Sequence, residues 1–274
     1  MPKRDFKYII LYMLTDGRLK TMDIVQDFYD KLAPQYDKLF LDWKTEVTEQ
    51  GGFLSRLFEE NGFDTDAEIL DCACGIGTQA IGLANSGYKV TASDISSGAL
   101  AEAKIRAKSF NADISFETAD FRCLSEVFTQ KFDIAIAMDN ALPHMLSKED
   151  LKSAVKSIVS LIKEGGIFVG SIRDYDALLK DKPPYSAPYI YKTDKGQRVS
   201  FQTWHWNGEC YKLVQYIIDD SETLEVSKFE CEYRATTRDE LTALFLSSGC
   251  KDVLWLFPEE SGFYQPIVIT RKSA

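Results

Sequence analysis

The strongest constraint on the fold is a regular alternation of short apolar runs and helix-length segments between residues 68 and 171. Strands joined by helices of this length form βαβ units, so the alternation predicts a parallel sheet with right-handed connections. The run at 132–138 is apolar throughout, which is typical of a strand buried on both faces. The runs that we expect to be strands are 68–72, 88–93, 113–117, 132–138 and 167–171. The segments that we expect to be helices are 78–86, 97–110 and one from Ser147 to Gly165-Gly166.

The segments on either side of this alternation have other patterns. Residues 23–60 show helical periodicity interrupted by Pro34, whereas residues 176–235 contain alternating, strand-like runs. Within the latter, Asn207-Gly208 between two such runs is a strong hairpin signal. The strand-like runs are 199–206, 210–218 and 224–233, and a helix at 237–248 with closing strands at 252–257 and 265–270 follows them.

The composition limits the classes of partner. The 274 residues carry a formal net charge of −10, which repels phosphate backbones, so we expect no nucleic-acid partner. The six cysteines form no C-x-x-C pair and only two histidines are present, which argues against a metal site and indicates reduced thiols. No apolar run approaches the ~20 residues that span a bilayer, so we expect no membrane partner.

The first residues of the chain bear on its location. Lys3 and Arg4 precede a short apolar run at 8–14, but Asp16 follows where a signal-peptide cleavage site needs small side chains. We therefore expect a cytoplasmic protein in which residues 1–21 are an extension and Met13 or Met22 is an alternative start.

A glycine motif, Leu70-Asp-Cys-Ala-Cys-Gly-Ile-Gly-Thr78, lies where the first strand ends and its helix begins. Glycines at 75 and 77 let the backbone approach a ligand, and the helix N-terminus offers N–H groups to a carboxylate or a phosphate. Gly75-x-Gly77-x-x-Ala80 also fits the dinucleotide fingerprint, and Asp94 would bind ribose hydroxyls in either case. The motif alone leaves open NAD, another nucleoside cofactor, or a tight turn without a ligand.

Three features resemble the class I S-adenosylmethionine-dependent methyltransferases. Asp71 stands four residues before Gly75, giving the run D-x-x-x-G-x-G-T of their first motif. Residues 118–121 resemble their adenine-contacting acidic motif, and residues 237–270 resemble their terminal helix and antiparallel hairpin. The resemblance implies a Rossmann-like α/β fold, with a seven-stranded, mostly parallel sheet that ends in an antiparallel hairpin and carries an inserted antiparallel β element. The organisation that it implies is a helical leader at 22–65, a cofactor-binding domain at 66–175 and 236–274, and the insert at 176–235.

The same resemblance assigns residues to the cofactor, S-adenosyl-L-methionine, whose product is S-adenosyl-L-homocysteine and which requires no metal. Asp71 and Gly75 correspond to positions under the methionine portion, and Asp94 to the position that holds the ribose hydroxyls. Asp120 corresponds to the partner of the adenine amino group, beside Phe121. The full set that we expect to bind the cofactor is Asp71, Cys72, Gly75, Gly77, Thr78, Asp94, Ile95, Asp120, Phe121, Met138 and Trp43.

Polar residues at the ends of the fourth and fifth strands are expected to face the ligand crevice. Asn140 and His144, together with Arg173-x-Tyr175, resemble the glycine and sarcosine N-methyltransferase group. That resemblance implies that Arg173 binds the carboxylate of the acceptor with help from Asn140, a contact that suits a planar guanidinium. Asp139 departs from the pattern as an extra acid, so a diamine or a larger amino acid stays open as the acceptor. The expected substrate-binding residues are Arg173, Asn140, Asp139 and Tyr175.

The leader at 28–37 resembles the segment that precedes this fold in many small-molecule methyltransferases, and its aromatic residues are expected to cover the cofactor. We expect an SN2 transfer that depends on holding three atoms in line, with His144, Tyr29 or Tyr36 assisting as catalytic residues. The acceptor is expected to be a small molecule, and the inserted strands serve either the pocket or a homo-oligomer. The alternatives are an O- or S-methyltransferase, an NAD-dependent oxidoreductase, and a cofactor-binding subunit without activity.

Overall fold

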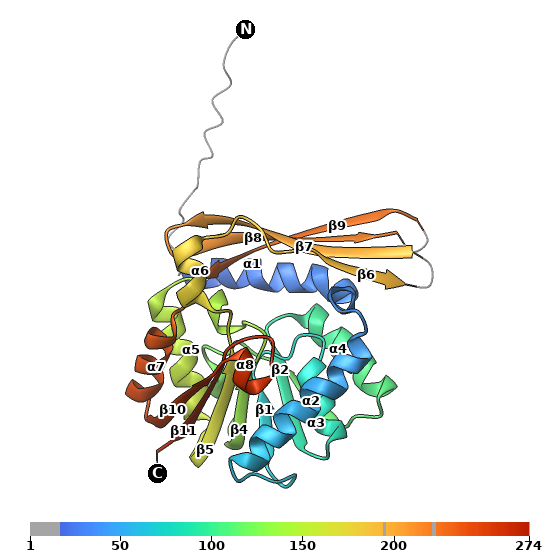
Figure 1. Ribbon diagram of the computed structural model, residues 1–274. Helices are drawn as coiled ribbons and strands as arrows, with labels where there is room; N and C mark the ends of the chain where they lie inside the picture. Colours follow the sequence, from blue (N-terminus) through green and yellow to red (C-terminus); the bar gives the residue numbers. More distant parts are fainter. Residues whose placement is uncertain (1–16, 194–195, 221–222, 274) are drawn as a thin grey trace.

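The computed structural model describes residues 17–193, 196–220 and 223–273, and its larger sheet has the strand order β10-β11-β5-β4-β1-β2-β3. The strands from β5 to β3 are parallel, whereas β11 runs antiparallel to both β5 and β10. The predicted α/β fold with a closing antiparallel hairpin is therefore confirmed (Figure 1). The strands are β1 (Glu68–Asp71), β2 (Lys89–Asp94), β3 (Ile114–Thr118), β4 (Phe132–Ala137), β5 (Ile162–Ser171), β10 (Cys250–Leu256) and β11 (Ile267–Lys272).

Neighbouring residues of the central strands enter two separate cores. Ile134 and Ile136 of β4 pack with α2 and α3 on one face, whereas Ala135 and Ala137 pack on the other face with α5 and α7. Burial on both faces explains why residues 132–138 are apolar throughout. The helices packed around the larger sheet are α2 (Trp43–Glu60), α3 (Thr78–Asn85), α4 (Ser97–Ser109), α5 (Lys148–Ser160), α7 (Arg238–Ser247) and the short α8 (Pro258–Ser261).

Two glycines bring α2 and α3 into close contact. A Cβ atom on Gly82 would lie 2.2 Å from the carbonyl oxygen of Val47, and one on Gly51 would lie 2.5 Å from the carbonyl carbon of Gly82. No larger side chain fits between backbones at these distances. The contact fixes α2 against the helix that follows the glycine motif.

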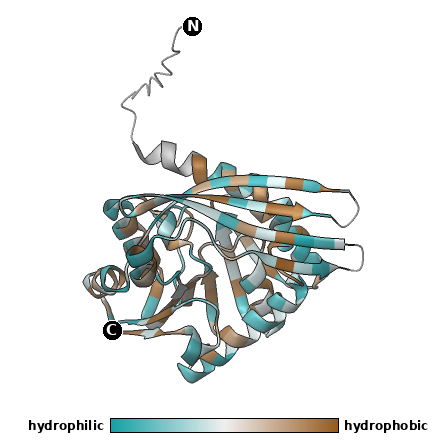
Figure 2. Ribbon diagram, turned by 45° about the horizontal axis from the view of Figure 1, so that its top comes forward, coloured by the Kyte–Doolittle hydropathy of each residue, from teal (hydrophilic) through white to brown (hydrophobic). Residues whose placement is uncertain are grey.

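A second sheet, with the order β6-β7-β8-β9, is antiparallel throughout. Helix α1 (Gly17–Leu32) lies between this sheet and the larger one, and contacts β9 on one side and α4 on the other (Figure 1). Hydrophilic and hydrophobic residues alternate along its strands, as expected for a sheet with one covered face (Figure 2). Its strands are β6 (Tyr189–Thr193), β7 (Gly196–Asn207), β8 (Cys210–Asp219) and β9 (Glu225–Arg234). The remaining elements are α6 (Tyr175–Asp181) and the 3-10 helices η1 (Ala33–Leu39), η2 (Leu124–Glu126) and η3 (Leu142–His144).

Three sequence predictions need correction. The glycines Gly165 and Gly166 do not end α5, which stops at Ser160; they lie inside β5, where the pairing with β4 shifts register. A Cβ on Gly166 would lie 2.5 Å from the carbonyl oxygen of Asp133, so glycine is needed here for close strand packing. The hairpin turn is Gly208-Glu209, because Asn207 still pairs with Cys210.

The third correction is strand β6, whose pairing with β7 the sequence pattern did not reveal. Residues 1–16 of the predicted extension at 1–21 lie outside the described residues. Residues 17–21 belong to α1, which begins at Gly17 in the described part of the chain. In the described part of the chain, none of the helices combines the length and the apolar composition needed to cross a membrane.

Candidate active site

Two adjoining spaces lie between the larger sheet and the smaller one. The inner cavity is about 820 Å³, counting its open mouth, and lies at the carboxyl ends of β1, β2 and β4 under α1 and η1. The outer cleft is about 2850 Å³, counting the solvent at its mouth, and runs beneath the smaller sheet towards α2 and α8. Tyr29, Tyr36 and Asp139 line both spaces. Ligands are expected at this position, outside the carboxyl ends of parallel strands.

The structure brings most of the predicted site residues to the wall of the inner cavity. Asp71, Gly77 and Trp43 do not line it but lie directly behind it, Arg173 lines the outer cleft, and Asn140 and Tyr175 line neither space. The predicted residues that line the inner cavity are Tyr29, Tyr36, Cys72, Gly75, Thr78, Asp94, Ile95, Asp120, Phe121, Met138, Asp139 and His144.

The glycine motif forms a tight turn beside a buried acid, one of whose carboxylate oxygens has no partner in the described part of the chain. Gly75 and Gly77 have φ angles of 53° and 92°, in the left-handed region that favours glycine. Asp71 is buried; its Oδ1 accepts a hydrogen bond from the Ala73 N–H at 3.2 Å, and its Oδ2 has no partner among the described residues. Burial raises the pKa of Asp71 to about 8. An unpaired buried oxygen is costly, so a ligand that donates to Asp71 would stabilise this turn.

Asp94 fixes the next strand end against the same turn. Its two carboxylate oxygens accept hydrogen bonds from the Gly75 and Ser96 N–H groups, each at 2.8 Å. Burial raises the pKa of Asp94, and these backbone hydrogen bonds oppose the shift. Because each carboxylate oxygen has a second lone pair, Asp94 keeps the capacity to accept from a ribose hydroxyl.

Helix α1 is fastened to the strand end beside Asp94. The Asp30 carboxylate accepts hydrogen bonds from the Ser96 hydroxyl at 2.5 Å and from the Gly98 N–H at 2.8 Å. The Trp43 indole N–H donates to the Thr78 hydroxyl at 2.9 Å, so Trp43 supports the wall of the cavity from behind. These contacts hold the leader over the cavity mouth.

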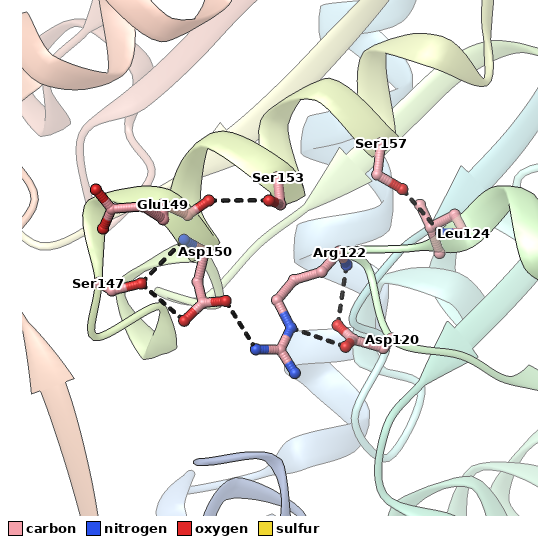
Figure 3. Close-up of polar contacts among 8 residues, drawn as sticks. All are labelled: Asp120, Arg122, Leu124, Ser147, Glu149, Asp150, Ser153 and Ser157. Atoms are coloured by element: carbon pink, nitrogen blue, oxygen red, sulfur yellow. Dashed lines mark hydrogen bonds and ion pairs between the residues drawn. The ribbon is translucent and has the colours of Figure 1, made fainter. Parts of the chain in front are cut away.

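Asp120 belongs to an ion-pair network at the wall of the inner cavity (Figure 3). Its carboxylate accepts from the Arg122 backbone N–H at 2.9 Å and from the Arg122 Nε–H at 2.8 Å. Arg122 also donates to Asp150 Oδ1 at 3.0 Å, and the Ser147 hydroxyl donates to Asp150 Oδ2 at 2.8 Å, so the network reaches the start of α5. Both Asp120 and Arg122 line the cavity, so the network fixes the orientation of Asp120 there.

His144 is buried where η3, α1 and β9 meet. Its Nε2 lies 2.9 Å from the Tyr29 hydroxyl, its Nδ1 lies 3.5 Å from the Cys231 sulfur, and its ring packs on Tyr233 at a centroid distance of 4.2 Å. Burial, aided by the positive charge of Arg173, lowers the pKa of His144 to about 3. A histidine with this pKa is neutral at pH 7 and a weak base, so it is better suited to holding Tyr29 in position than to accepting a proton.

The two tyrosines are equally poor bases. Burial raises the pKa of both Tyr29 and Tyr36 well above the usual value of tyrosine. Both hydroxyls therefore stay protonated near neutral pH, and the Tyr36 hydroxyl can donate a hydrogen bond to a ligand in either space.

Arg173 presents its guanidinium to the outer cleft. Its Nη1 donates to the Tyr211 hydroxyl at 2.6 Å, its Nη2 donates to Gln202 Oε1 at 3.1 Å, and its guanidinium lies over Trp204 and Tyr233. No carboxylate pairs with it among the described residues, although arginine stays charged at neutral pH. The nearby carboxylates of Asp174 and Asp176 pair with Arg238 instead.

Asn140 orients Arg173 from behind the cleft. Its Oδ1 accepts from the Arg173 backbone N–H at 3.1 Å, and its buried Nδ2 has no partner among the described residues. Tyr175 is fully buried, and its hydroxyl lies 2.9 Å from that of Tyr211. Asn140 and Tyr175 therefore support the position of Arg173 from behind.

Several site residues escaped sequence reasoning because they come from distant segments. On the covered face of the smaller sheet, Tyr211 pairs in register with Trp206 of β7 and with Tyr233 of β9. The alternation that put Trp204 and Trp206 on one face would have placed Tyr211 there too. Four further lining residues belong to no sequence motif that would have indicated a place in the site: Gln79, Gln202, Arg122 and Tyr264.

The known sequences described below as similar to this chain are all methyltransferases. Residues 69–166 match a family model described as a methyltransferase domain. The chain is 29% identical over 155 residues to a glycine/sarcosine N-methyltransferase of Parasynechococcus marenigrum, covering 57% of this chain and 54% of the relative. It is 27% identical over 201 residues to a glycine/sarcosine/dimethylglycine N-methyltransferase of Actinopolyspora halophila, covering 73% of this chain and 34% of the relative. The matched regions thus span about half or less of these curated relatives.

A solved structure shows the same fold over nearly the whole chain. An S-adenosylmethionine-dependent methyltransferase from Clostridium acetobutylicum superposes with a TM-score of 0.71 at 22% identity, covering 90% of this chain and 99% of that one.

Proposed function

Because this chain contains a class I S-adenosylmethionine-dependent methyltransferase domain, we propose that it methylates the amine of a small, carboxylate-bearing acceptor. One observation carries the choice of acceptor: Arg173 directs a charged guanidinium into the outer cleft without a carboxylate partner among the described residues. A ligand carboxylate would supply that partner through two parallel hydrogen bonds. The curated relatives that act on glycine and sarcosine support the same class of acceptor.

The inner cavity fits the cofactor on features of this chain. The unpaired Oδ2 of Asp71 and the positive φ angles of the glycine turn suit the methionine portion, and Asp94 suits the ribose. Asp120 and Phe121 suit the adenine. S-adenosylmethionine, when bound there, supplies an electrophilic methyl group on a sulfonium.

The remaining task of the protein is to position the acceptor. Arg173 would hold its carboxylate, while Tyr29 and Tyr36, at the junction of the two spaces, would hold its amine end near the cofactor. Positioning of this kind accounts for several kcal/mol of barrier reduction in bimolecular transfers. The outer cleft is larger than glycine requires, so acceptors with longer side chains fit as well.

The test is a methyl-transfer assay with labelled S-adenosylmethionine and paired acceptors. Glycine, sarcosine and larger amino acids are compared with methylamine and ethanolamine, which lack the carboxylate. We expect label on the carboxylate-bearing amines, and an increase in acceptor KM of roughly 10- to 100-fold in Arg173→Met, from the loss of charged hydrogen bonds.

A matched arginine variant controls for general damage. Arg271→Met removes hydrogen bonds to the carbonyl oxygens of Gly165 and Asn61, which line neither space, and should leave the acceptor KM unchanged. Equal turnover of amines with and without a carboxylate, or an Arg173→Met variant with wild-type KM, would overturn the choice of acceptor. Preferred transfer to hydroxyl or thiol compounds would replace N-methylation by the corresponding chemistry.

A further inference from the structure

Asp139 lies where the two spaces meet. It lies two residues beyond the end of β4, and among the residues after that strand it is the one that lines both the inner cavity and the outer cleft. If the cofactor occupies the cavity and the acceptor occupies the cleft, as proposed above, the methyl group crosses between them beside this carboxylate.

The backbone of Asp139 is held in an unusual conformation. Asp139 and Asn140 have φ angles of 54° and 68°, two successive non-glycine residues in the left-handed region. Such residues cost free energy and are found where the surrounding structure fixes them, often at active sites. Ser171 does so here, because its hydroxyl accepts from the Asp139 N–H at 2.8 Å and its carbonyl accepts from the Asn140 N–H at 3.0 Å.

The carboxylate of Asp139 is oriented by neutral groups alone. Oδ1 accepts a hydrogen bond from the Tyr264 hydroxyl, and Oδ2 accepts from Gln79 Nε2 at 2.8 Å. Gln79 is held in turn by Gln50 Oε1 at 2.7 Å. In the described part of the chain no Lys, Arg or His pairs with Asp139, and each oxygen retains a lone pair for a further donor.

The other acid–base groups at the junction are unsuited to accept a proton. His144 has a pKa of about 3, because it is buried and faces the charge of Arg173. Tyr29 and Tyr36 have pKa values raised by burial, so both remain protonated. An amine acceptor enters mostly as its ammonium ion at neutral pH and must lose a proton before it can attack.

We propose that Asp139 is the general base that accepts the proton from the acceptor ammonium, an inference that rests on the proposed function. The N–H bond breaks as the proton passes to the carboxylate of Asp139. The freed nitrogen lone pair then forms the N–C bond to the methyl carbon as the C–S bond breaks, and its electron pair stays on sulfur. The carboxyl returns its proton to solvent when the products leave.

The electrostatic surroundings of Asp139 favour this role. Burial raises its pKa, the hydrogen bonds from Tyr264 and Gln79 oppose the shift, and Glu46 on α2 adds to it. A carboxylate whose pKa lies above the usual value is a stronger base at neutral pH. The other charged or titratable groups near it are Tyr36 on η1, Asp71 at the end of β1, and Arg173, which also acts on Tyr36 and Tyr264.

The first test compares pH profiles of wild type and Asp139→Asn. Without the base, only the free amine reacts, so the activity of Asp139→Asn should rise about tenfold per pH unit up to the pKa of the amine. We expect kcat/KM to be reduced roughly 100-fold near pH 7 and to approach wild type near pH 9.5. Asp133→Asn is the matched control, because Asp133 lies at the opposite end of β4 and pairs with Lys163; this variant should follow wild type.

A second readout does not depend on turnover. Acceptor is titrated calorimetrically into protein loaded with S-adenosylhomocysteine, in buffers of different ionisation enthalpy, to count the protons released. When the acceptor is bound as the free amine, wild type should release almost no proton, because the proton passes to Asp139, whereas Asp139→Asn should release about one to the buffer. Tyr264→Phe removes a hydrogen bond to the carboxylate, so it should shift the acid limb of the profile upward by roughly one pH unit.

The outcomes separate the two proposals. A wild type that methylates no amine defeats the proposed function itself. If the wild type is active, two results overturn the role of Asp139 as base. One is a pH profile of Asp139→Asn that runs parallel to the wild-type profile. The other is weakened binding of S-adenosylhomocysteine by Asp139→Asn. Should Asp139→Asn fail to fold, an unshifted acid limb in Tyr264→Phe overturns it equally.

Discussion

Burial of a neutral histidine at the centre of the site has a measurable effect on stability. His144 has a folded-state pKa of about 3, compared with ~6.5 for an unfolded histidine. Below pH 6.5 the unfolded chain binds a proton at this residue and the native protein does not. The free energy of unfolding therefore falls as the pH falls, because protons favour the unfolded state.

The magnitude follows from the two pKa values. Between pH 7.5 and pH 5.0 the contribution of His144 to the free energy of unfolding falls by about 2 kcal/mol, from RT ln(1 + 10^(6.5 − pH)). Asp71 acts in the opposite direction, because its pKa of about 8 keeps on the native carboxyl a proton that the unfolded chain lacks over this interval. The wild-type dependence on pH is therefore a sum, and a variant is needed to isolate His144.

The assay is urea unfolding of wild type and His144→Gln at pH 7.5 and pH 5.0. Gln has no titrating group, so the loss of unfolding free energy on acidification should be smaller in the variant by about 2 kcal/mol. Identical losses in the two proteins would show that His144 is not held neutral, and would restore it as a candidate base.

Three further predictions concern the frame of the site. Gly82→Ala would place a Cβ 2.2 Å from the Val47 carbonyl oxygen. Thermal unfolding should show that the free energy of unfolding falls by about 2 kcal/mol or more. An unchanged midpoint temperature would contradict the close packing of α2 and α3. Arg122→Met should remove the side-chain hydrogen bond to the Asp120 carboxylate. The ratio of Kd values that favours S-adenosylhomocysteine over its 6-oxo analogue should then fall by about tenfold. If Arg122 is purely structural, the variant would bind both ligands more weakly by the same factor. Asp30→Asn should weaken the attachment of α1, so that stopped-flow fluorescence shows faster release of S-adenosylhomocysteine; an unchanged release rate would mean that α1 does not control access.

The fold was predictable where its signals are local. The alternation between residues 68 and 171 specified the parallel strands because each strand buries both faces, as Ile134 and Ala135 do on opposite sides of β4. Local signals also misled: Gly165-Gly166 is typical of a helix end, yet these residues allow β5 to pack closely on β4. Strand β6 is recognisable only from its pairing with β7, which no local pattern encodes.

The two halves of the site differ in the same way. Predicted cofactor residues cluster at strand ends close to one another in sequence, so Asp94 and Asp120 lie on the cavity wall where the motifs placed them. The surroundings of Arg173 and Asp139 depend on contacts across long sequence separations. Tyr211 lies 38 residues from Arg173, and Tyr264 lies 125 residues from Asp139. The roles of Arg173 and Asp139 could therefore be inferred only from the three-dimensional structure.

The central claim, that the inner cavity binds S-adenosylmethionine, is tested most directly by calorimetric titration of the purified chain with S-adenosylhomocysteine. We predict binding at about one site per chain with a Kd in the micromolar range or below. Absence of binding heat from protein shown to be folded by circular dichroism, together with binding of NADH, would contradict the claim and return the glycine turn to the dinucleotide interpretation.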